Sequence, residues 1–300
     1  ILTDMGKTFV SVKRIMEILE EPAEEDHPEA GTPPIRGEIV FQGVSFSYDE
    51  GCEVLRDVSV RIPRGATVAV LGPTGCGKST LVHLIAGLYP CETGEILIDG
   101  TPVKRIRRDW LRRHVGLVLQ EPFLYSKSLR ENIGIREESP RDEDVHAAAR
   151  DAAIHEVIME MEKGYETAVG ERGVTLSGGQ KQRVAMARTL MAPYPVLIFD
   201  DSLSAVDTET DAAIRKALAM RKEKATTIII SHRITTLAEA ELILVMDKGR
   251  IVQAGTHADL LAAEGLYQRI AALQNDLAEE LSLVMEGEDE NGRSGHEYTS

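Results

Sequence analysis

Residues 72–80 have the sequence Gly72-Pro73-Thr74-Gly75-Cys76-Gly77-Lys78-Ser79-Thr80. The apolar run 67–71 before them predicts a short buried strand, and the residues after them carry apolar side chains at helical spacing, namely Leu81, Leu84, Ile85 and Leu88. A glycine-rich turn between a strand and a helix is the context that a phosphate-binding loop requires. The glycines let backbone N–H groups converge on an anion, and the helix N-terminus adds positive potential.

Two side chains at the start of that helix complete the expected site. Lys78 would bridge the outer phosphates of a nucleoside triphosphate, and the hydroxyl of Ser79 would ligate Mg²⁺. The alternative is a glycine-rich turn without a ligand. The strand before the turn and the helix after it favour the nucleotide site.

A second element of the same site is the run Val196-Leu197-Ile198-Phe199-Asp200. This apolar strand delivers a carboxylate at its C-terminal edge, where α/β sheets bind ligands. We expect Asp200 to hold Mg²⁺ through water. A turn aspartate at the end of a strand is the alternative interpretation.

A second glycine-rich helix start is Leu176-Ser177-Gly178-Gly179-Gln180. It predicts another anion-binding helix N-terminus in the same chain. One nucleotide does not need two such sites within one subunit, so a second copy of the chain, or a relative, could place this motif over the γ-phosphate of the first. The alternative is a capped helix without a ligand.

Composition limits the class of protein. The 300 residues carry a formal net charge of −15, of which −5 lies in 1–34 and −7 in 276–300. An acidic chain without a basic stripe argues against nucleic acid as a partner. No run of 18 apolar residues occurs, which argues against a membrane span. The three cysteines have no CxxC spacing, which favours reduced thiols. The first residue is Ile1, from which we expect a fragment of a longer protein.

The order of apolar segments predicts an α/β protein. Residues 7–20 have helical spacing and are followed by an acidic linker to Pro34. Short strands at 38–48, 54–62 and 66–72 are expected to be antiparallel. Later strands, including 95–98, 115–119, 196–199, 226–230, 242–246 and 250–253, alternate with helices, which predicts a mostly parallel central sheet.

The motifs, taken in order, resemble the nucleotide-binding domain of ATP-binding cassette (ABC) proteins over residues 35–275. The matching segments are Gly72–Thr80, Gln120, Leu176–Gln180, Val196–Asp201, Ser204–Asp207 and His232. The resemblance implies a P-loop NTPase (RecA-like) core with an antiparallel β subdomain and a helical subdomain inserted at about 121–190. It also implies two ATP molecules sandwiched in a head-to-tail dimer, an N-terminal segment 1–34 that ends a membrane-domain helix, and an acidic tail 276–300.

The resemblance also implies roles for single residues. Tyr48 would stack on adenine, Gln120 would touch Mg²⁺ and the γ-phosphate, and His232 would contact the γ-phosphate and position the attacking water. Ser177, Gly178, Gly179 and Gln180 would act on the partner's nucleotide. Asp207 would cross the dimer interface, or cap the helix 208–220, or do both.

One position departs from the family pattern. Where the family usually has the glutamate that orients the hydrolytic water, this chain has Asp201, which is one methylene shorter by about 1.5 Å. We therefore expect the site to bind ATP well and hydrolyse it slowly, as in one half of a heterodimeric exporter with a weak site. A slow homodimer is the rival interpretation.

Two segments favour an exporter. Residues 167–173 resemble the exporter-specific loop that touches the membrane domain, and 9–22 resemble the last membrane helix of an exporter leading into its cassette. The expected partners are a second cassette and the membrane domain of the same full-length chain, at the cytoplasmic face of a membrane. The alternatives are the ATPase subunit of an importer, which lacks both features, and a non-transport ABC ATPase.

Overall fold

The structure is a computed structural model that describes residues 10–16, 19–20, 24–49, 51–170, 175–204, 206–220 and 225–276. Several expectations fall outside these ranges. They concern Phe9 and Ile18 of the first helix, positions 171–173 of the expected exporter loop, Ala205, and the acidic tail from 277.

An antiparallel sheet of four strands has the order β2-β1-β4-β5. Its strands are β1 (Ile39–Ser47), β2 (Glu53–Ile62), β4 (Thr93–Ile98) and β5 (Thr101–Pro102). β1 is central and pairs with β2 on one side and β4 on the other. Its side chains alternate between buried and more exposed positions, as expected for a sheet with one face on the core.

The larger sheet has six strands in the order β10-β9-β3-β8-β7-β6. They are β3 (Thr67–Leu71), β6 (Val115–Val118), β7 (Val196–Asp200), β8 (Thr226–Ile230), β9 (Leu242–Asp247) and β10 (Arg250–Gly255). All neighbours are parallel except β9 and β10. The expectation that 66–72 is antiparallel is wrong, because β3 pairs in parallel with β8 and β9. Four of its five residues are buried in succession, which is the pattern of a strand covered on both faces.

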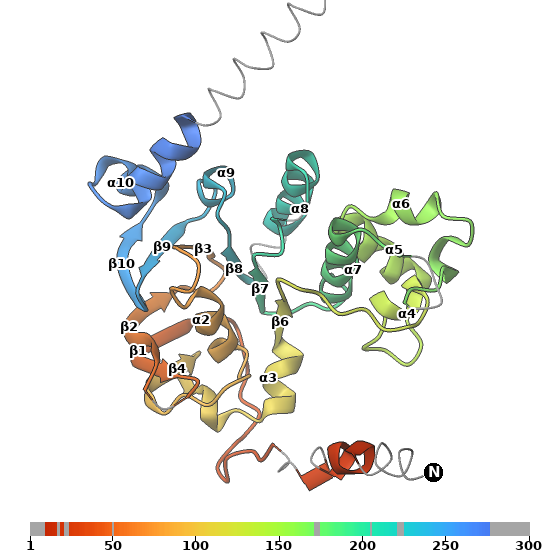
Figure 1. Cartoon of the computed structure of the whole chain (residues 1–300), viewed down its shortest axis with the longest axis horizontal. Coiled ribbons are helices and arrows are strands. Elements are labelled where there is room, and N and C mark those ends of the chain that lie inside the picture. The colour runs from red at the N-terminus through yellow and green to blue at the C-terminus, as the bar shows by residue number, and fades with distance from the viewer. Residues whose placement is uncertain are drawn as a thin grey trace, which may run out of the picture.

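Helices surround the two sheets. Between β3 and β6 in the sequence are the helices α2 (Lys78–Ile85), η1 (Val103–Arg105) and α3 (Arg108–His114). The last ones in the described sequence are α8 (Thr208–Met220), α9 (Ile234–Leu237), α10 (His257–Ala262) and a helix at 266–276. A group coloured green in Figure 1 lies apart from β1, β2 and β4 and contains α4 (Leu129–Ile133), α5 (Asp142–Asp151), α6 (His155–Met159), η2 (Gly164–Glu166) and α7 (Gly178–Leu190). α7 packs on α4 and α5 in this group.

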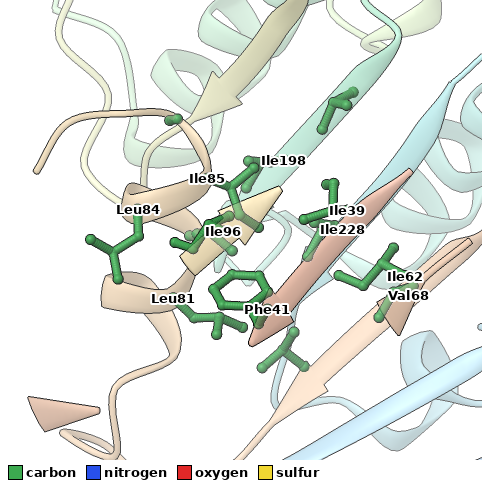
Figure 2. Close-up of a cluster of buried hydrophobic side chains, with 14 of the residues drawn as sticks. Ile39, Phe41, Ile62, Val68, Leu81, Leu84, Ile85, Ile96, Ile198 and Ile228 are labelled. Atoms are coloured by element: carbon green, nitrogen blue, oxygen red, sulfur yellow. The ribbon is translucent and has the colours of Figure 1, made fainter. Parts of the chain in front are cut away.

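The main core holds α2 between the two sheets (Figure 2). Leu81 and Ile85 of α2 are fully buried, with Phe41 of β1 on one side and Ile198 and Ile228 of the parallel sheet in the same cluster. Burying such side chains contributes about 1.5–3 kcal/mol each. The loop at the start of α2 is therefore fixed by the core that holds the helix.

Hydrogen bonds join the segment before β1 to α3. The indole N–H of Trp110 donates to the carbonyl oxygen of Pro33 at 2.8 Å, and the backbone N–H of Arg108 donates to Asp26 at 2.9 Å. Earlier in the chain, residues 10–16 are helical, and Val10, Val12, Ile15 and Met16 are exposed. Among the described residues, no helix has the length and apolar character needed to cross a membrane.

Candidate functional site

The phosphate-binding loop connects β3 to α2 and depends on its glycines. Gly75 and Gly77 have φ values of 80° and 101°, and Gly77 occupies the position before the first residue of α2. Side chains at such angles are strained, so glycine is needed here. The Lys78 ammonium group is buried and donates to the carbonyl oxygens of Gly72 at 2.8 Å and Pro73 at 3.0 Å. The Lys78 side chain is thus held by backbone carbonyl oxygens of its own loop.

Oxygen ligands suited to a hard cation meet beside the loop. The Ser79 hydroxyl donates to Asp200 Oδ1 at 2.9 Å, and Asp200 ends β7 with only 3% of its surface exposed. His83, one turn after Ser79 on α2, places Nε2 3.5 Å from Asp200 Oδ2. A hydroxyl and a carboxylate at hydrogen-bond distance form a donor set that fits Mg²⁺. Within the part of the chain that the structure describes, no cluster of three or more His, Cys, Asp or Glu suited to a metal occurs, so the oxygen ligands expected here are those of Ser79 and Asp200.

Gln120, Asp201 and His232, which the resemblance places at the γ-phosphate and the attacking water, line the same cavity. The Gln120 amide donates to Asp201 Oδ2 at 3.3 Å, and His232 lines the same cavity. Asp201 has a φ of 47°, and its backbone N–H donates to Ile230 at the end of β8. Burial raises the pKa of the Asp201 carboxyl, although the nearby His232 acts in the opposite direction. Asp201 Oδ1 is buried and has no hydrogen-bond partner among the residues that the structure describes.

Tyr48 lines the same cavity and is half-exposed. Its hydroxyl shares a 3.0 Å hydrogen bond with the Thr80 hydroxyl, and its ring makes edge contacts of 5.0 Å with Phe46 and with Tyr89. These contacts hold the plane of the Tyr48 ring. An aromatic ring in this position suits base stacking.

These groups line one cavity of about 320 Å³. Its walls include most of the residues predicted to bind a nucleotide within one chain, namely Tyr48, Thr74, Gly75, Gly77, Lys78, Ser79, Thr80, Gln120, Asp200, Asp201 and His232. Gly72, Pro73 and Cys76 of the same loop are not among the lining residues. Cys76 is buried, which raises the pKa of its thiol.

The motif Ser177–Gln180 does not line this cavity. It begins α7, where the Ser177 hydroxyl accepts from the backbone N–H of Gln180 at 3.2 Å and the Gln180 side chain accepts from the backbone N–H of Ser177 at 2.9 Å. Ser177 and Gly178 are both exposed. The helix start is therefore capped within the chain and open to a partner.

Comparison with known proteins agrees with this geometry. A family model described as ABC transporter matches residues 55–204. The chain belongs to the ABC transporter family. A putative multidrug export ATP-binding/permease protein of Bacillus subtilis is 43% identical over 276 residues, which cover 91% of this chain and 48% of that protein. ATP-binding cassette sub-family B member 6 of Mesocricetus auratus is 40% identical over 278 residues, covering 91% of this chain and 33% of that protein.

A solved structure of a bacterial Atm1-family ABC exporter with ATP bound superposes with a TM-score of 0.83 at 37% identity. The match covers 89% of this chain and 47% of that one. The chain thus spans about half the length, or less, of the relatives it matches. The predicted family, the α/β fold and an ATP-binding domain of the exporter type are confirmed.

Asp207 caps α8, as one of the two interpretations predicts. Its carboxylate accepts from the backbone N–H of Thr210 at 2.9 Å and from the Thr210 hydroxyl at 2.8 Å. These hydrogen bonds lower the pKa of the exposed Asp207 carboxyl. The cap does not test the other interpretation, a contact across an ABC dimer.

Three functional neighbours escape the motif analysis. His83 beside Asp200 could have been found from its spacing of four residues after Ser79 on one helix. Tyr89 beside Tyr48 gives no such signal, because a turn separates it from α2. Arg233 donates to the carbonyl oxygens of Ser204 at 3.2 Å and Val206 at 2.9 Å, and only the fold brings these segments together.

Proposed function

We propose that this chain is the motor domain of an ABC exporter, which binds ATP with Mg²⁺ in the cavity beside α2 and hydrolyses it to drive export across a membrane. One observation carries the proposal. The loop before α2, the Ser79–Asp200 pair, Gln120 and His232 all line a single cavity, although they come from four separate parts of the sequence.

ATP binding follows from the loop and its lysine. The Lys78 ammonium group is held by two backbone carbonyls and would exchange these for phosphate oxygens, which carry a full negative charge. Ser79, Asp200 and Gln120 would hold Mg²⁺, which when bound neutralises charge on the outer phosphates. Tyr48 would stack on the base, worth about 1–3 kcal/mol.

Hydrolysis would depend on Asp201 and His232. The Asp201 carboxylate, which lines the cavity, would accept from the attacking water, while the Gln120 amide orients it through Oδ2. His232 would contact the γ-phosphate and place that water. The short Asp201 side chain makes this a slow site, and the chain would then pair as the weak-site subunit of a heterodimer, with a slow homodimer as the rival arrangement.

A second cassette would complete the site. The start of α7 is exposed and lies outside the cavity of its own chain, so Ser177, Gly178, Gly179 and Gln180 are available to a partner's γ-phosphate, with Asp207 beside the interface. Binding of ATP would close the two cassettes. Hydrolysis would remove the charge that joins them, and the dimer would open.

The membrane domain of the full-length protein would lie N-terminal to the cassette, at the cytoplasmic face of a membrane. The exposed apolar residues of helix 10–16 support a partner on that segment. Phe123 and Tyr125, an exposed aromatic pair 5.1 Å apart, follow Gln120 in the chain and offer a second contact. Movement at Gln120 would reach the membrane domain through this pair.

Binding of a fluorescent ATP analogue with Mg²⁺ tests the proposal. Lys78→Ala should abolish binding, and ATP-dependent dimer formation should disappear in light scattering. Lys104→Ala is the matched control, because Lys104 is an exposed lysine paired with Glu95 away from the cavity. ATP affinity equal to that of the unmodified chain in Lys78→Ala would contradict the assignment.

A further inference from the structure

The backbone around His232 is held by a side chain from the far end of the described sequence. Gln274 lies in helix 266–276, and its amide nitrogen donates to the carbonyl oxygen of His232 at 2.6 Å. Its amide oxygen accepts from the backbone N–H of Ile234 at 3.0 Å. One side chain therefore binds the chain on both sides of Arg233, and 42 residues separate Gln274 from His232.

The requirement for glutamine follows from helix geometry. Ile234 is the first residue of α9, and the first N–H groups of a helix have no acceptor within the helix. The preceding residue, Arg233, provides no side-chain cap. Gln274 supplies the missing acceptor and, from the same planar amide, a donor for the carbonyl of His232. Glutamate can offer only the acceptor, and an apolar side chain offers neither.

Helix 266–276 is itself fixed by burial. Tyr267 is fully buried and its hydroxyl lies 2.6 Å from His257 Nδ1, while Ala271 is 2% exposed. Tyr267, Ala271 and Gln274 are spaced by four and three residues, so they share one helix face. That face packs against the cluster containing Leu237 of α9, and Figure 1 shows the helix in blue beside α9. The buried helix face thus holds Gln274 beside the loop that contains His232.

A second anchor holds the same loop from the other side. The Arg233 guanidinium donates to the carbonyl oxygens of Ser204 and Val206, in the segment that follows Asp201. The backbone beside His232 is thus held by both anchors, and His232 lines the nucleotide cavity.

We propose that Gln274 is a positioning residue for His232. By fixing the backbone before and after Arg233, it holds the imidazole where it can meet the γ-phosphate. The proposal rests on the role given to His232 under the proposed function, and it links the C-terminal helix to the nucleotide site. Gln274 touches no nucleotide and acts only through the loop.

The test compares Gln274→Met with Gln268→Ala in the whole 300-residue chain. Gln268 is a matched control, because it lies on the same helix and its amide also donates to a backbone carbonyl, that of Leu261, far from His232. We expect Gln274→Met to lower ATP turnover about five- to thirtyfold, which corresponds to the loss of one or two hydrogen bonds, with ATP affinity changed less than twofold. Gln268→Ala should leave both unchanged.

A double-mutant cycle separates positioning from general stability. In a His232→Ala background, Gln274→Met should change turnover less than twofold, because the side chain it positions is gone. An equal loss in both backgrounds, or a Gln274→Met chain with normal turnover, overturns the proposal. If Gln274→Met does not fold, Gln274→Glu takes its place in the test. Glutamate keeps the acceptor for Ile234 but loses the donor to His232, so its ATP turnover should be lower than that of the unmodified chain.

Ring NMR signals of His232, identified by their absence in His232→Ala, provide a readout independent of turnover. Gln274→Met should shift or broaden them relative to Gln268→Ala, and unchanged signals overturn the proposal. If His232→Ala leaves turnover unaltered, the role of His232 in the proposed function fails. The NMR comparison then still decides whether Gln274 sets its position.

Discussion

Replacing Asp201 by glutamate should raise the rate of ATP hydrolysis, because the longer side chain carries its carboxylate further into the cavity. In the present structure the Asp201 carboxylate meets the Gln120 amide at 3.3 Å, which is beyond the usual 2.7–3.2 Å range for such hydrogen bonds. The other oxygen, Oδ1, has no partner. The expectation rests on the shorter reach of aspartate, which has one methylene less than glutamate.

The size of the gain follows from the length of one methylene, about 1.5 Å. Misplacing a catalytic group by about 1 Å costs on the order of 100-fold in rate. A hundredfold gain corresponds to about 2.7 kcal/mol of transition-state stabilisation. We therefore expect Asp201→Glu to increase turnover by up to about 100-fold, with little change in ATP affinity, since Lys78 and the loop amides are untouched.

Phosphate release at saturating ATP and Mg²⁺ measures this gain, in a sample that light scattering shows to be dimeric. The chain carrying both Lys78→Ala and Asp201→Glu serves as the control and should be inactive, which excludes a contaminating ATPase. Turnover of Asp201→Glu within about twofold of the unmodified chain, at equal ATP affinity, would refute the reasoning. The shorter carboxylate would then already reach the attacking water.

Other expectations concern the core, the loop and its thiol. Phe41→Ala, which removes a fully buried ring, should lower the free energy of unfolding by about 3–5 kcal/mol in urea titrations. Gly72→Ala should destabilise the chain by about 1–3 kcal/mol and weaken ATP binding, because the added Cβ overlaps the carbonyl oxygen of Met246. Its effect should be visible in the same titration and in the ATP-binding assay. Burial raises the pKa of the Cys76 thiol, so less of it is thiolate at neutral pH. In mass spectrometry, a thiol reagent should therefore label exposed Cys52 first and Cys76 faster as the pH rises.

The order of the strands explains why residues from separate motifs line one cavity. β3, β8, β7 and β6 are neighbours in the sheet, and they run in parallel. Their carboxyl ends therefore meet at one edge and bring together the loop at Gly72, His232, Asp200 and Gln120. The loop at Gly72 and Asp200 are recognisable because each follows an apolar run, which is a local property of sequence, whereas Gln120 and His232 are assigned only through the resemblance. The order of strands in the sheet is not local, and spacing alone could not supply it.

The direction of β3 shows the limit of local signals. Short turns on both sides of 66–72 suggested a continuation of the antiparallel strands before it. The deciding property was burial on both faces, which appears in the sequence as an unbroken apolar run and is typical of parallel strands. The positions of turns in the sequence predict where a strand begins and ends. They do not predict which strand pairs with it, and the partners of β3 are the distant strands β8 and β9.

Hydrogen bonds from side chains to distant backbone groups are the part of the site that sequence patterns miss. Gln274 is partly exposed on helix 266–276. A glutamine at such a position commonly faces solvent, and it does not contribute to the apolar periodicity by which a helix is recognised in a sequence. Its two bonds to the His232 loop exist because Tyr267 and Ala271 fix the helix against α9, and because Ile234 needs an acceptor at the start of that helix. The residues proposed to act on the nucleotide thus lie in recognisable motifs, while their placement depends on polar contacts that only the packed structure reveals.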